Sequence, residues 1–364
     1  MAERSNTRLV ASLPGTGAGT MQIMASGGYL YIGELARGGG TQIVDARDPR
    51  RPRRVGRLEG YPGAFSPKVQ TSGDRLLVNY EARQGDAAFV GLGVWDIAQP
   101  ERPTRVGQLA TGGRGIHRMW HTGGRYAYAS VIPEGQARRI LTIIDLENPA
   151  APVEVTRWRA DLDEPAGRNY GLHHPIVADG VAYMGWWDYG VIIADVSDPA
   201  HPRQLGAASG WAAQGGGHTH TALPLTGRGL MVVTDEAGDE EGEETRKLIR
   251  VFDARDVAAP RLLAICPPPE GDYGRGGVRF GPHNLHENRP GSFQSERLIF
   301  ATYFGAGLRV YDLSEPSQPI EVASFAPDPA EEGYFPINDL FVDANGLIYL
   351  TDRRAGNLYI VELT

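Results

Sequence analysis

A short motif that recurs six times along the chain constrains its fold more than any other feature. Each copy is a run rich in apolar and β-branched residues that ends in an aspartate, as in Gln42-Ile43-Val44-Asp45. Five copies continue into Pro-x-x-Pro, and because proline cannot extend a strand ladder, each copy predicts a β-strand that ends in an Asp-capped turn. The aspartates stand at intervals of 51, 49, 50, 58 and 59 residues: Asp45, Asp96, Asp145, Asp195, Asp253 and Asp312.

Further strands are expected around each copy. One strand follows the prolines, as at 54–58, and two strands joined by a Gly-rich hairpin precede the motif, as at 21–25 and 29–33. Four strands in about 50 residues, repeated seven times, are typical of a seven-bladed β-propeller. The predicted fold class is therefore all-β, with four-stranded antiparallel blades, and residues 1–364 are expected to form a single domain.

The two ends of the chain predict how the propeller closes. A seventh, shortened copy at 358–362 has no fourth strand after it, whereas residues 8–13 resemble the fourth strands of other copies, such as 321–325. We expect this N-terminal strand to complete the last blade, which would leave no open sheet edge. An unclosed solenoid is the alternative.

The repeated motifs also carry a family resemblance. Through the segments 42–45, 141–145 and 191–195, the chain resembles the LVIVD-repeat propellers over nearly its whole length. This resemblance implies the propeller fold and leaves the activity open, because propellers host unrelated functions.

Composition excludes several classes of partner. A net charge of -8 without a basic block argues against nucleic-acid binding, and no apolar run approaches the roughly 20 residues that span a bilayer. The single cysteine, Cys266, excludes an internal disulfide and a cysteine-rich zinc site. The N-terminus lacks the apolar stretch of a signal peptide, so a cytoplasmic protein is expected. The oligomeric state stays open.

Histidines supply the strongest chemical signal. Eight of the nine fall in four clusters, and each cluster is expected to begin the innermost strand of blades three, four, five and six. Imidazoles from four consecutive blades would then meet, and neutral imidazole is a common ligand of transition metals. We predict one transition-metal ion, with iron favoured and manganese, copper or zinc as alternatives, held by His117, His174, His220 and His283.

The strand register decides which histidine of each cluster binds. Alternation places His218 and His220 on one face of a strand and puts His173 and His174 on opposite faces. An uncertainty of one residue keeps His173 and His218 as alternative ligands. The residues expected behind the ligands or against the substrate are His173, His218, His121, Trp187 and Asn338.

Loops between the second and third strands are expected on the same face as the histidines. They bring possible acids and bases, which we assign to Tyr303, Asp188 and Tyr189, with His286 from the last histidine cluster as a fourth candidate. No Gly-x-Ser-x-Gly elbow is present, which disfavours a serine hydrolase.

Two functions follow as hypotheses. The first is a metalloenzyme acting on a small organic substrate; its four-histidine centre is similar in architecture to those of carotenoid-cleavage oxygenases, and selenium-binding proteins offer another comparison. Oxidoreductase chemistry is favoured, and a metal-dependent lyase or isomerase is nearly as well supported. The second hypothesis is a non-catalytic propeller that binds a protein partner, and metal analysis would separate the two.

Overall fold

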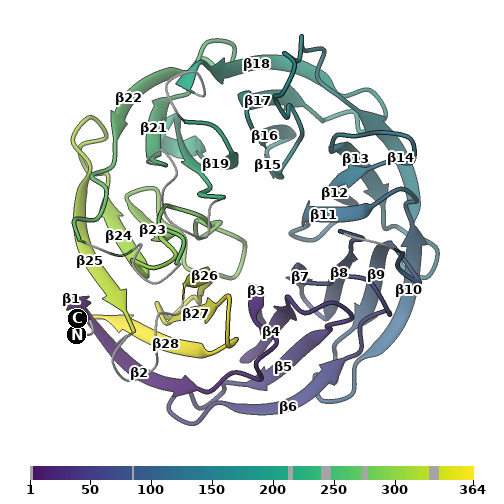
Figure 1. Cartoon of the computed structure of the whole chain (residues 1–364), viewed down its shortest axis with the longest axis vertical. Coiled ribbons are helices and arrows are strands. Elements are labelled where there is room, and N and C mark those ends of the chain that lie inside the picture. The colour runs from purple at the N-terminus through teal and green to yellow at the C-terminus, as the bar shows by residue number, and fades with distance from the viewer. Residues whose placement is uncertain are drawn as a thin grey trace. The chain divides into compact units, whose positions relative to one another are not determined.

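The computed structural model describes residues 3–83, 86–211, 216–238, 247–271, 273, 278–327 and 336–364. Almost all regular structure in this part of the chain is β-strand, and a short 3-10 turn, η2 (Thr226–Arg228), lies between two strands. Within the same ranges no helix has the length and apolar character needed to cross a membrane. The strands form seven four-stranded sheets, which confirms the predicted seven-bladed β-propeller with antiparallel blades (Figure 1).

Contacts group the chain into two compact units. The first unit contains Met1–Arg8, Ala160–Leu347 and Glu362–Thr364, and the second contains Leu9–Arg159 and Ile348–Val361. The expectation of one domain over residues 1–364 stays a prediction.

The second unit holds three complete sheets. The first comprises β3 (Thr20–Ser26), β4 (Tyr29–Glu34), β5 (Thr41–Asp45) and β6 (Arg53–Leu58). The next comprises β7 (Val69–Ser72), β8 (Arg75–Tyr80), β9 (Gly91–Asp96) and β10 (Thr104–Ala110). The third comprises β11 (Gly115–Trp120), β12 (Tyr126–Ile132), β13 (Ile140–Asp145) and β14 (Val153–Trp158).

The first unit also holds three complete sheets. Two follow the chain in order: β15 (His174–Ala178), β16 (Val181–Trp186), β17 (Gly190–Asp195) and β18 (Arg203–Ser209), then β19 (Thr219–Leu225), β20 (Leu230–Asp235), β21 (Ile249–Asp253) and β22 (Arg261–Ile265). The third has the order β1-β25-β24-β23, built from β1 (Glu3–Ser5), β23 (Leu298–Thr302), β24 (Leu308–Asp312) and β25 (Ile320–Ala326).

The seventh sheet confirms the predicted closure. Its order is β2-β28-β27-β26, from β2 (Thr7–Leu13), β26 (Ile337–Val342), β27 (Ile348–Asp352) and β28 (Leu358–Leu363). The N-terminal strand therefore supplies the fourth strand of the last blade. A feature that the sequence analysis missed is β1, which pairs antiparallel with β25 of the preceding blade.

The motif aspartates end their strands as expected. In each of the six copies a carboxylate oxygen accepts a hydrogen bond from the backbone N–H two residues further on, for example Asp145 from Glu147 at 2.8 Å. This bond closes an Asx turn at the end of the third strand. The repeat thus encodes both the strand and the turn that stops it.

The inner segment of the sixth blade differs from the prediction. Residues 283–286 form no regular strand, although His283 N–H bonds to Thr302 O and His286 N–H to Phe300 O, both at 2.9 Å. Pro282 before the segment lacks an N–H, and Asn288 after it has a φ of 48°. A regular ladder is therefore interrupted at both ends, while the segment still lies along β23.

Candidate metal centre

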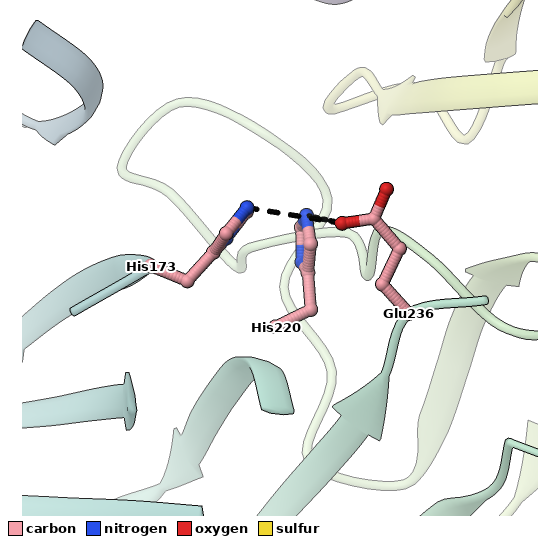
Figure 2. Close-up of side chains that lie close together, drawn as sticks. All are labelled: His173, His220 and Glu236. Carbon is pink, nitrogen blue, oxygen red and sulfur yellow. Dashed lines mark ion pairs between the residues drawn. The ribbon is translucent and has the colours of Figure 1, made fainter. Parts of the chain in front are cut away.

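Two histidines and one glutamate of the first unit form a compact buried group. His173 lies just before β15, His220 lies in β19, and Glu236 directly follows β20. Each offers one ligand atom, and these atoms all lie within 4.8 Å of one another. Figure 2 shows both rings turned towards the Glu236 carboxylate, with His220 between His173 and Glu236.

The local backbone explains how the two histidines approach each other. A side chain at Gly185 in β16 would place its Cβ 2.5 Å from the backbone oxygen of His220, so only glycine allows β16 to lie this close to β19. His173 N–H bonds to Gly185 O at 2.7 Å on the other side. The His173 and His220 rings are consequently 4.1 Å apart between centroids.

A β-bulge sets the direction of the His220 side chain. The pairing between β19 and β20 shifts register between Thr219 and Thr221, so His220 occupies the bulge. Bulges redirect a side chain and are common beside active sites. The same irregularity occurs between Ile116 and Arg118 in β11, where His117 occupies the bulge.

The spacing of the group suits a metal ion better than direct hydrogen bonds. Nε2 of His173 is 3.8 Å and Nε2 of His220 is 3.9 Å from Oε2 of Glu236, which is too long for a hydrogen bond. Metal–nitrogen bonds of about 2.0–2.2 Å would hold ligand atoms roughly 3–3.5 Å apart, so only a small contraction is needed. Two neutral imidazoles and a carboxylate match transition-metal ligation.

His283 and Arg279 adjoin the other oxygen of the same carboxylate. Nε2 of His283 lies 3.5 Å from Oε1 of Glu236, and Nη1 of Arg279 donates a hydrogen bond to it at 3.2 Å. Nδ1 of His283 lies 2.7 Å from the backbone oxygen of Asn338. Donation of the Nδ1 proton to this oxygen leaves the Nε2 lone pair directed towards Glu236, the form that binds a metal.

Aromatic rings stack on His173 and on the adjoining His283. Trp187 stacks on His173, with centroids 5.0 Å apart, and on His218, with centroids 4.6 Å apart. Phe304 stacks on His283 at 4.6 Å. Trp187, His218 and Phe304 all have positive φ values, of 38°, 59° and 43°. Non-glycine residues rarely adopt this conformation, and it concentrates at functional sites.

The predicted ligands are only partly brought together. The compact group among the described residues contains His173, His220 and Glu236, with His283 beside it, so a centre of four histidines is not shown. In blade four the structure brings His173 to the group, whereas Nε2 of His174 faces Glu287 at 3.4 Å. His173 was the alternative that the register left open.

His117 lies in the second unit, where it contacts a buried carboxylate. Its Nδ1 is 3.0 Å from Oε2 of Glu81, which Arg83 and Arg139 also approach. Burial lowers the pKa of His117 to about 3, with Arg139 acting in the same direction and Glu81 opposing. Burial alone would raise the pKa of Glu81, but His117, Arg139 and Arg83 together hold it below its usual range. His117 is therefore a neutral donor to an ionised Glu81.

The other predicted residues have varied surroundings. Asp188 lies 3.7 Å from Nε2 of His218 and accepts the Asn169 N–H, and Tyr189 packs on Tyr170. Nδ1 of His121 lies 3.1 Å from the backbone oxygen of Tyr126.

Backbone contacts hold His286, and Tyr303 is deeply buried. His286 accepts the Val342 N–H at Nδ1 and donates from Nε2 to Phe293 O, which ties its ring to the backbone. Tyr303 packs against Phe280. The catalytic assignments of Tyr303, Asp188, Tyr189 and His286 stay predictions.

Glu236 is the residue that sequence reasoning did not place among the ligands. The sequence places it among several charged residues in loops after second strands, any of which could supply an acid, a base or a carboxylate near a metal. The signal that could have singled it out is position, because it follows the strand that pairs with the His220 strand. Its N–H bonds to His218 O at 2.8 Å, which places the two segments side by side.

Comparisons with known proteins identify the repeats. Four segments match the LVIVD repeat, at residues 17–58, 124–159, 176–207 and 300–326. The chain therefore carries LVIVD repeats. No curated protein matches the sequence of this LVIVD-repeat chain.

Solved structures that resemble the LVIVD-repeat chain agree on its fold. The computationally designed Ika8 protein has a TM-score of 0.57 at 12% identity, with 97% of this chain and 99% of Ika8 covered. The periplasmic gluconolactonase PpgL of Pseudomonas aeruginosa has a TM-score of 0.60 at 14% identity, with coverages of 91% and 93%. At such identities the likeness concerns the fold alone.

Proposed function

We propose that this chain is a metal-dependent enzyme that acts on a small organic substrate. The observation that carries the proposal is the convergence of His173 and His220 on the buried carboxylate of Glu236. Three protein ligands leave coordination positions for substrate or water, as catalytic sites require. His283, next to the other carboxylate oxygen, is the candidate fourth ligand.

The ligand set favours iron and oxidoreductase chemistry. Two histidines and one carboxylate with open positions are the typical ligands of non-haem iron in oxygenases. Lyase or isomerase chemistry would use the same ion as a Lewis acid that polarises a substrate oxygen.

Metal-assisted hydrolysis is the second candidate. Two histidines and a glutamate also hold zinc in hydrolytic enzymes. The propeller that matches with a TM-score of 0.60 is named a gluconolactonase, and a lactone is a small substrate of the kind this site would take.

The surrounding side chains would orient the substrate. Trp187 and His218 form a stacked wall beside His173, suited to a flat or apolar portion of the substrate. Arg279 supplies a positive charge next to Glu236, which favours a substrate with a carboxylate or an enolate-like oxygen. Asp188, 3.7 Å from His218, would hold that ring in place.

Metal analysis of the purified chain tests the proposal. Protein supplied with iron, manganese, cobalt or zinc should bind about one ion per chain, and His220→Ala should bind none. The iron-loaded protein, supplied with candidate substrates, would then be tested for oxygen consumption, and the zinc-loaded protein for lactone hydrolysis. A wild-type chain that binds none of the four metals at micromolar concentration would contradict the metalloenzyme.

A further inference from the structure

A chain of buried polar contacts runs from the side of His220 that faces away from Glu236. Nδ1 of His220 is 2.6 Å from the Thr221 hydroxyl, which is 3.5 Å from Nδ1 of His174. Nε2 of His174 is 3.4 Å from Glu287, and Glu287 is 3.4 Å from Arg289. We call Thr221, His174, Glu287 and Arg289 the Thr221 relay.

One assignment of protons is compatible with every contact in the relay. A His220 ring that offers its Nε2 lone pair to a metal carries its proton on Nδ1 and donates it to Thr221. The Thr221 hydroxyl then donates to Nδ1 of His174. His174 in turn carries its proton on Nε2, directed at the Glu287 carboxylate. The direction of donation is therefore uniform from the candidate ligand to the buried anion.

A fully buried path that contains an ion pair is unusual for contacts that serve only the stability of the fold. All five residues of the path, His220 and the relay, are buried, and Glu287 and Arg289 are charged. A buried ion pair contributes little net stability, because desolvation offsets its attraction. Polar groups behind a ligating imidazole, in contrast, fix the tautomer of the ring and raise its basicity.

We propose that Thr221 and Glu287 are positioning residues that hold His220 in its metal-binding tautomer and strengthen its bond to the ion. This inference rests on the proposed function, since it assigns the relay to a ligand of that metal centre. His174 transmits the effect, which explains why a histidine stands beside His173 without facing Glu236. Removing the relay should weaken metal binding without removing a ligand.

Cobalt(II) titration of four variants tests the relay. Thr221→Val replaces the hydroxyl by a methyl group, Thr221→Ser keeps it, and Glu287→Gln removes the charge. Thr142→Val is the matched control, because Thr142 is also a buried threonine but lies in the second unit. Metal affinity is measured against a competing chelator, and thermal unfolding of the metal-free proteins shows that each variant is folded.

The relay predicts affinity losses of about 10- to 100-fold for Thr221→Val and Glu287→Gln, the range typical of groups behind metal ligands. Thr221→Ser and Thr142→Val should bind like wild type. Nitrogen NMR of the metal-free chain should also show His220 protonated on Nδ1 in wild type and a mixture of tautomers in Thr221→Val. A purely structural role would not change the tautomer.

The outcomes separate this inference from the proposed function. If His220→Ala abolishes cobalt binding while Thr221→Val and Glu287→Gln bind like wild type, the relay is wrong and the metal centre stands. If His220→Ala binds cobalt as tightly as wild type, the proposed function is wrong. Should Thr221→Val fail to fold, Glu287→Gln alone decides, because a wild-type affinity there overturns the relay.

Discussion

Nε2 of His220 lies 3.9 Å from Oε2 of Glu236, and both side chains are buried. His220 lies in β19 and Glu236 directly follows β20, the adjacent strand of the same blade, and the β-bulge at His220 turns its ring towards the end of β20. A glutamate that had no place in the predicted ligand set thus supplies negative charge to the candidate metal centre.

Glu236→Gln should weaken metal binding without unfolding the chain. The amide keeps the shape of the side chain but loses the charge, so we expect a loss of roughly 100-fold in affinity, or about 2.7 kcal/mol. Isothermal titration with zinc or cobalt measures it. Glu362→Gln, at a glutamate that pairs with Arg8 on the surface, is the control and should bind normally.

His173→Ala and His174→Ala should differ in their effects. The structure directs His173 at Glu236 and His174 at Glu287, so the first variant should lose metal binding and the second should retain it with a weaker affinity. Elemental analysis after dialysis distinguishes them. If instead His174→Ala lost the ion and His173→Ala retained it fully, His174 would be the ligand, as the sequence predicts.

Trp187 should report metal binding by fluorescence. Its ring stacks 5.0 Å from that of His173, so a paramagnetic ion such as copper or cobalt at the site should quench it strongly. We expect Trp187→Phe to lose most of the metal-induced quenching, whereas Trp158→Phe, in the second unit, should keep it. Equal quenching in the two variants would place the ion elsewhere.

Two N-terminal truncations should separate the roles of β1 and β2. Deleting residues 1–6 removes only β1, which pairs over three residues with β25. Deleting residues 1–13 also removes β2 and leaves the seventh blade with three strands. At about 1 kcal/mol for each backbone hydrogen bond, we expect a small drop in melting temperature for the first and a much larger drop for the second. Equal melting temperatures would contradict the closure by β2.

Stability should fall as the pH drops from about 6.5 to 4. Burial lowers the pKa of His286 to about 4 and that of His117 to about 3, so the folded chain keeps both rings neutral while the unfolded chain takes up protons. Their contribution is complete above pH 6.5 and is lost on acidification through this window. Urea unfolding at several pH values measures the free energy of unfolding. His286→Asn should reduce the slope of this free energy against pH by the equivalent of about one proton.

The repeat in the sequence was sufficient for the fold class. The six Asp-terminated motifs and the shortened seventh copy predicted the number of blades. The aspartates also predicted the turn that ends the third strand in six of them, because an aspartate capping its own backbone is a local interaction. The match between residues 8–13 and the fourth strands predicted the closing strand. The sequence does not predict β1, because its three polar residues lack the alternation of apolar and polar side chains that indicates a strand.

The sequence by itself also showed that most histidines fall in four clusters, and so indicated where a metal would bind. Tertiary structure decided which histidine faces the centre. Side chains alternate between the two faces of a strand, and the bulge at His220 interrupts this alternation. The placement of Glu236 beside His220, and the close approach of β16 and β19 at Gly185, arise from contacts between strands and between blades. Such contacts depend on register and backbone spacing, which no local sequence pattern encodes.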